Sequence, residues 1–250
     1  MVLGVTAWTL IVVAAILVGL AKTALPGSGI LPVALLAGVL PAKASTGIVL
    51  LMLIVGDVAA ITVYRRDADF GALKRLLPAV LVGVAAGGGY LSFASDLATK
   101  RTIGGILLAM VTWTVVRRRL SRRPNPHHGD ESSIHPVRRW FYGSLAGFTT
   151  MVANAGGPVT SIYMLSAGFD VVRFLGTTAW FYFAVNLIKV PVAIAVGSVG
   201  WQTLTTAGLM APVILLSALV GVRLARIMPQ RVFDPLVLGF SALAAAWLLV

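Results

Sequence analysis

Two lysines lie inside long apolar runs of the sequence. Lys22 is close to the end of a run over residues 3–24, and Lys189 lies deep in a run over 174–196. A lysine at the centre of a bilayer costs at least about 2.5–3.5 kcal/mol, so a lysine in such a run is a candidate for function. Both side chains are positively charged, and the chemistry they predict is the binding of an anion.

Glycine and proline interrupt the chain before two short apolar runs, 30–40 and 158–167. A helix that starts after such a break exposes unpaired N–H groups and about half a positive charge at its first turn. Glycine lets a ligand approach the backbone closely, and Pro158 suits the first helical position, where no N–H is required. Each break therefore also favours an anion. The breaks contain Pro26, Gly27, Ser28 and Gly29 in the first case and Asn154, Gly156, Gly157 and Pro158 in the second.

The composition indicates which elements position these residues. Hydrophobic residues make up 58% of the 250 positions and charged residues 11%, whereas a soluble domain carries about 25% charged residues. Several apolar runs reach about 20 residues, the length that crosses a hydrocarbon core of about 30 Å. The sequence thus predicts an all-α polytopic membrane protein. Full spans are expected at 44–64, 76–95, 102–116, 174–196, 203–222 and 232–250.

The basic residues predict the orientation. The formal net charge is +12, and basic clusters can mark nucleic-acid binding. Here, however, lysine and arginine lie almost entirely between apolar runs, as they do in cytoplasmic loops. If the loop 117–137, the loop after 44–64 and the loop between 203–222 and 232–250 are all cytoplasmic, 15 of the 20 basic residues lie inside, Arg173 among them. We therefore expect a multi-pass protein of the cell (inner or plasma) membrane, with both termini outside the cytoplasm and no nucleic-acid partner.

Each half of the chain is predicted to follow the same pattern. A re-entrant or broken helix hairpin precedes three full spans, and because three is odd the second half is inverted relative to the first. One offset, 130 residues, relates Gly27 to Gly157 and Lys43 to Arg173. The predicted organisation is a first transmembrane repeat over 1–116, a linker loop over 117–137 and a second repeat over 138–250.

Interrupted helices in inverted repeats are typical of transporters, whose binding sites lie at the interruptions. We expect Lys22, Asn186 and Lys189 to join the residues of both breaks in one central site for a small anion. Asp57 leaves an alternative open, because it is the only carboxylate well inside an apolar run. Pairing of Asp57 with either lysine would remove much of the positive charge of the site.

These motifs resemble those of the sulfite exporter TauE/SafE family of membrane transporters, which includes permeases of the 4-toluene sulfonate uptake type. The resemblance covers both halves and leaves out the linker. It implies transport of sulfite or of a small organosulfonate such as sulfoacetate, with export favoured. An anion channel and a carrier of a non-sulfur organic anion are the alternatives. The matching residues are Pro26 to Gly29, Leu31, Pro32, Gly38 and Ala44 to Thr46 in the first half, and Gly143, Gly147, Asn154, Gly156 to Pro158, Gly168, Gly176, Thr177 and Asn186 to Lys189 in the second.

The sequence argues against an enzyme. A hydrolytic or redox site needs a nucleophile with a base, or a set of metal ligands. The chain has no cysteine, and its three histidines, His127, His128 and His135, fall in one polar loop. No catalytic residue, metal or cofactor is therefore predicted. The expected partners are a small anionic substrate and the lipid bilayer, and a homodimer is left open.

Overall fold

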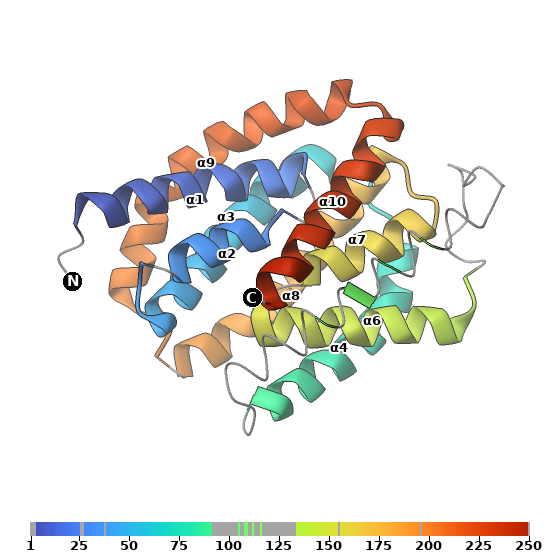
Figure 1. Ribbon diagram of the computed structural model, residues 1–250, viewed down its shortest axis with the longest axis horizontal. Helices are drawn as coiled ribbons and strands as arrows, with labels where there is room; N and C mark the ends of the chain where they lie inside the picture. The colour runs from blue at the N-terminus through green and yellow to red at the C-terminus, as the bar shows by residue number, and fades with distance from the viewer. Residues whose placement is uncertain are drawn as a thin grey trace. The chain divides into compact units, whose positions relative to one another are not determined.

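The computed structural model describes residues 4–25, 28–37, 39–91, 134–154, 156–195 and 197–249, with single positions at 105, 108, 109, 112 and 116. Regular structure in these ranges is entirely α-helical, which confirms the predicted all-α class for the described part of the chain. Most of the predicted span 102–116 and of the loop 117–137 lies outside it. The helices are α1 (Val5–Thr23), α2 (Ile30–Ala37), α3 (Ala42–Tyr64), α4 (Phe70–Leu91), α6 (Pro136–Ala153), α7 (Gly156–Ser166), α8 (Val171–Ala195), α9 (Trp201–Ile227) and α10 (Gln230–Leu249) (Figure 1).

Five of the described helices, α1, α3, α4, α8 and α9, are long and apolar enough to cross a membrane. The chain is therefore a multi-pass membrane protein. Four of these helices match predicted full spans, and α10 covers residues 232–249 of the predicted span 232–250. The predicted start of α4, residue 76, was wrong by six residues. The helix begins earlier than the apolar run because the Asp69 carboxylate accepts a hydrogen bond from Ala72 N–H, at 2.8 Å, in the first turn.

Both predicted breaks are present. The first helix, α1, ends at Thr23, and the short α2 begins at Ile30; α6 ends at Ala153, and the short α7 begins at Gly156. We expected Pro158 at the first helical position of α7, but the helix starts two residues earlier. The proline is tolerated there because none of the first four N–H groups of a helix has an intrahelical acceptor.

Helix positions recur along the chain. Shifting α1, α3 and α4 by 130 residues places their first residues within one position of the starts of α6, α8 and α9. The two short helices α2 and α7 follow the same order, although their starts differ by four residues after the shift. The offset found in the sequence motifs thus also relates whole helices.

The described chain forms two compact units, each built from segments of both halves. In the first unit, α1 packs along α9 (Figure 1). A Cβ at Gly19 would lie 2.0 Å from Ser217 Oγ, so the two helices approach closely through small residues. The first unit comprises Met1–Leu25, Gly29–Ala68 and Leu175–Met228, and the second comprises Pro26–Ser28, Asp69–Phe174 and Pro229–Val250.

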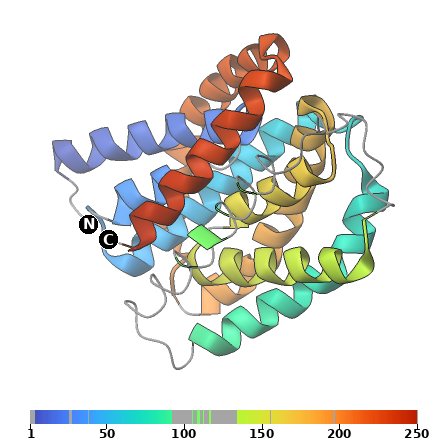
Figure 2. The same ribbon diagram turned by 45° about the vertical axis from the view of Figure 1, so that its right-hand side comes forward.

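In the second unit, α4 packs along α6 (Figure 2). The approach is again closest at glycines. A Cβ at Gly83 would lie 1.9 Å from the carbonyl oxygen of Ser144, and one at Gly147 would lie 2.1 Å from that of Val80. After the 130-residue shift, this pair of helices corresponds to α9 and α1 of the first unit.

Helix α3 and the part of α8 from Leu175 onward, both in the first unit, run antiparallel. A Cβ at Gly47, near the start of α3, would lie 1.8 Å from the carbonyl oxygen of Ser198, which follows α8. A Cβ at Gly176, near the start of α8, would lie 2.6 Å from the carbonyl oxygen of Tyr64, the last residue of α3. Each helix therefore starts where the other ends.

Candidate functional site

Asp57 lies at the centre of a buried polar cluster in the first unit. It is on α3, and none of its surface is exposed. The neighbouring Gly56 leaves room for another side chain, because a Cβ there would lie 2.9 Å from Lys22 Cγ and 3.0 Å from Val18 Cγ1. The absence of a side chain at position 56 thus lets the lysine stem pass over α3. We call Lys22, Asp57, Asn186 and Lys189 the Asp57 cluster.

Lys22 forms an ion pair with Asp57. Its Nζ lies 2.6 Å from Asp57 Oδ1 and 4.6 Å from the centre of the Tyr182 ring, over the ring face. An aromatic face attracts a cation, most strongly where water is excluded. The alternative that the sequence left open is therefore realised for Lys22: its charge faces a carboxylate and an aromatic ring.

Asn186 fixes the other carboxylate oxygen. Its Nδ2 donates a hydrogen bond to Asp57 Oδ2 at 2.8 Å, and the side chain is buried. The sequence predicted Asn186 as a residue of the anion site. The structure shows that its amide joins α8 to α3.

Lys189 follows Asn186 by three residues on α8, so the two side chains lie on the same side of the helix. It is 9% exposed and lies within electrostatic range of both Lys22 and Asp57. The cluster therefore combines two lysines with one carboxylate. With both lysines protonated, its net charge is +1.

The end of α1, which carries Lys22, is held from several sides. Thr23 Oγ1 donates to the carbonyl oxygen of Gly19 at 2.8 Å and to that of Ala218 on α9 at 3.2 Å. Tyr64 Oη donates to the carbonyl oxygen of Thr23 at 2.9 Å. These bonds fix the helix end and with it the base of the Lys22 side chain. Sequence reasoning missed Tyr64 and Gly56, whose neighbours here are distant in the sequence.

The second break lies in the second unit. Asn154 adopts the left-handed conformation (φ 51°, ψ 23°) that ends α6, and its N–H donates to the carbonyl oxygens of Thr149 and Thr150. Close packing governs the start of α7, since a Cβ at Gly156 would lie 2.7 Å from Thr150 Cβ. Asparagine is one of the few residues that adopts this conformation readily. Asn154 therefore ends α6 through its backbone conformation.

The predicted site residues thus separate into groups. Lys22, Asn186 and Lys189 meet in the Asp57 cluster, whereas Asn154, Gly156, Gly157 and Pro158 lie at the second break. Ser28 is buried and Gly29 is partly buried, and Pro26 and Gly27 lie outside the described residues. That both breaks share one site stays a prediction.

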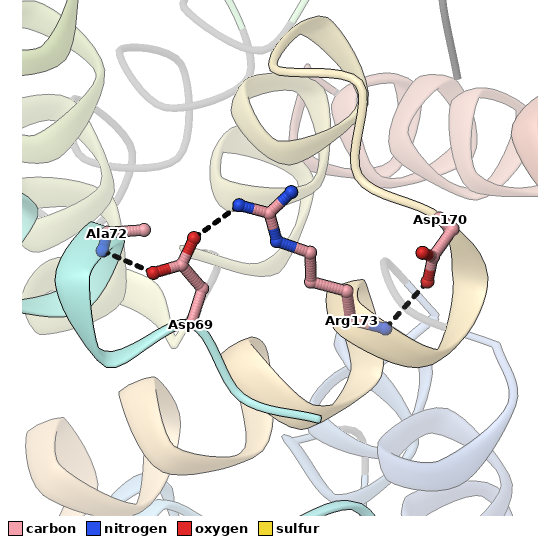
Figure 3. A network of polar contacts seen from close by, with 4 residues as sticks. All are labelled: Asp69, Ala72, Asp170 and Arg173. Atoms are coloured by element: carbon pink, nitrogen blue, oxygen red, sulfur yellow. Dashed lines mark hydrogen bonds and ion pairs between the residues drawn. The ribbon is translucent and has the colours of Figure 1, made fainter. Parts of the chain in front are cut away.

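A second polar network joins the starts of α4 and α8 in the second unit (Figure 3). The Arg173 guanidinium donates to the Asp69 carboxylate and lies 4.2 Å from the centre of the Phe169 ring. Asp170 Oδ1 accepts from Arg173 N–H at 2.9 Å. Partial burial raises the pKa of Asp69, but the hydrogen bonds from Arg173 and Ala72 and the positive charges of Arg173 and Arg75 outweigh burial and hold the pKa below its ordinary value.

Among the described residues, no three histidines and carboxylates come together as metal ligands. The Asp57 cluster offers electrostatic interactions, because it brings two lysine side chains, one carboxylate and one amide together away from the surface.

The sequence model of the family described as "Sulfite exporter TauE/SafE" matches residues 11–248, nearly the whole chain. No curated protein and no solved structure matches the chain. The match includes every residue of the Asp57 cluster and both helix breaks. It confirms the resemblance seen in the sequence, and the chain belongs to the sulfite exporter TauE/SafE family of membrane transporters.

Proposed function

We propose that this protein carries sulfite or a small organosulfonate such as sulfoacetate across the cell membrane, and that the Asp57 cluster contributes to the binding site. The observation that carries the proposal is a fully buried carboxylate with two lysines near it, Lys22 paired with it and 11% exposed and Lys189 9% exposed. Charged groups within membrane spans are costly and mark the paths of substrates and ions. The family membership makes transport of sulfite or a related anion the expected task.

An inverted repeat would explain the arrangement of the helices. In this proposal α1 to α4 and α6 to α9 are equivalent, and the second set is turned over in the membrane. The antiparallel course of α3 and α8, which start within one residue of each other after the 130-residue shift, supports it. Inverted repeats with interrupted helices bind their substrates near the middle of the membrane.

The residues at the breaks are further proposed ligands. Gly29 precedes α2, and Gly156, Gly157 and Pro158 form the start of α7. Helix starts present N–H groups and a partial positive charge, which suits an oxyanion. For Pro26, Gly27, Ser28 and Asn154 the proposal rests on the sequence pattern and the family.

Export is the favoured direction. An anion that leaves a cell with a negative interior moves down the electrical gradient, which contributes about 2.3 kcal/mol per charge per 100 mV. The proposed orientation, with the loop 117–137 in the cytoplasm and both termini outside, follows the distribution of basic residues. Net export then needs no second ion.

The test is sulfite flux in proteoliposomes that contain the purified protein. We expect Lys189→Ala to reduce the flux at least about tenfold, because a loss of about 1.4 kcal/mol in anion binding changes the equilibrium by that factor. Lys74→Ala is the matched control, since Lys74 is exposed on α4, and it should leave the flux unchanged. Equal flux in both variants would remove Lys189 from the mechanism. Flux that saturates with sulfite concentration is expected of a carrier, and flux that does not saturate would favour a channel.

A further inference from the structure

The charges of the Asp57 cluster are unequal in number and in exposure. With both lysines protonated and Asp57 ionised, the cluster holds two positive charges against one negative charge. The Lys22 side chain is 11% exposed and Lys189 is 9% exposed, whereas Asp57 has no exposed surface. The two lysines are thus slightly exposed, whereas the carboxylate is completely buried.

Asp57 is also held in a fixed position. Lys22 contacts one of its oxygens at 2.6 Å and Asn186 donates to the other at 2.8 Å. The two contacts come from different helices, α1 and α8. The carboxylate is therefore fixed in place, and with Asp57 ionised and both lysines protonated the cluster presents a net charge of +1 to a ligand.

We infer that the Asp57 cluster selects monovalent over divalent anions, and that Asp57 is the residue that sets this preference. The inference rests on the proposed function and narrows its substrate class. A monovalent anion brings the buried charge of the cluster to zero, whereas a divalent anion leaves an uncompensated negative charge, which is costly away from water. Among the proposed substrates, hydrogensulfite fits the cluster better than the sulfite dianion or the doubly charged sulfoacetate.

Methanesulfonate and sulfate provide a matched pair of probes. Both present oxygens arranged around a sulfur atom, and they carry one and two negative charges at neutral pH. In proteoliposomes, we expect the wild-type protein to transport methanesulfonate at least about tenfold faster than sulfate, given the strength of charge interactions in a partly buried site. The ratio of these two rates is the quantity that tests the inference.

Two variants separate the effect of charge from the effect of shape. Asp57→Asn keeps the size of the side chain and an oxygen that can accept from Asn186, but it raises the cluster charge to +2. We expect the methanesulfonate-to-sulfate ratio to fall about tenfold in this variant. The double variant Asp57→Asn with Lys22→Gln returns the cluster charge to +1, and we expect it to restore the preference for methanesulfonate.

The outcomes distinguish the inference from the proposed function. If the wild-type protein transports sulfite but moves methanesulfonate and sulfate equally well, charge selection is wrong and transport stands. The same holds if Asp57→Asn leaves the ratio unchanged. If Asp57→Asn does not fold, the inference is tested by the methanesulfonate-to-sulfate ratios of the wild type and of the double variant. Absence of flux for sulfite and for both probes would overturn the proposed function together with the inference.

Discussion

Lys22 at the end of α1 pairs with Asp57 in the middle of α3, with 2.6 Å between Nζ and Oδ1. The ion pair lies directly before the first helix break, so it ties the end of the broken helix to an unbroken one. Removing one partner of a buried ion pair is strongly destabilising because the other charge remains without compensation. The pair therefore has a structural role as well as an electrostatic one.

Lys22→Met tests that structural role. The substitution keeps a long apolar side chain but removes the ammonium that contacts Asp57 Oδ1, so the buried carboxylate keeps only the hydrogen bond from Asn186 and the charge of Lys189. We expect the free energy of unfolding to fall by about 3–5 kcal/mol, measured by denaturant or thermal unfolding in detergent. Combining Lys22→Met with Asp57→Asn should recover most of the loss, because the side chain at position 57 that lost its ion-pair partner is then neutral. If the two changes simply add, the ion pair does not couple these helices.

The contact between Gly47 and Ser198 gives a prediction about packing. A Cβ at position 47 would lie 1.8 Å from the carbonyl oxygen of Ser198, so Gly47→Ala must push the start of α3 away from the end of α8. We expect a loss of about 1–3 kcal/mol in the free energy of unfolding, as for other overpacked positions. Gly208→Ala on α9 is the control, because a Cβ there meets nothing within 4 Å. A stable Gly47→Ala variant would contradict the close approach of the two helices.

The Asp69–Arg173 pair predicts a dependence of stability on pH. The folded-state pKa of Asp69 lies below the ordinary value of 3.8, so the unfolded chain binds a proton more readily than the folded one. The stabilisation is therefore present above pH 3.8 and is lost as the pH falls through the folded-state pKa. We expect Asp69→Asn to lower the melting temperature at neutral pH and to converge with the wild type in acid. The control is Asp67→Asn, at an exposed position. Any difference in melting temperature between this variant and the wild type should be the same at neutral pH and in acid.

Much of the fold follows from local features of the sequence. Helix length and apolarity predicted α3 and α8 to within three residues and the start of α9 to within two, although α9 ends five residues later than predicted. Glycine and proline located the breaks after Thr23 and before Gly156. The start of α4 was missed because a polar cap at Asp69 extends the helix into a basic segment, where hydrophobicity gives no signal.

The site was harder to predict because its contacts join distant parts of the chain. Charge in apolar runs singled out Lys22, Lys189 and Asp57, but nothing local states which lysine the carboxylate meets. The choice depends on Gly56, which opens the space that the Lys22 stem fills. The hydrogen bond from Tyr64 to Thr23 could not be predicted for the same reason, since the two residues lie on different helices.

Asn154 offers a test that separates a backbone role from a ligand role. Its left-handed conformation suits glycine as well as asparagine, whereas alanine in this conformation costs about 1–2 kcal/mol. We expect Asn154→Gly to unfold at the wild-type temperature and Asn154→Ala to unfold earlier. If the amide binds substrate as proposed, the glycine variant will nevertheless show a raised KM for sulfite in proteoliposomes. A glycine variant with both wild-type stability and wild-type KM would show that the asparagine serves only to end α6.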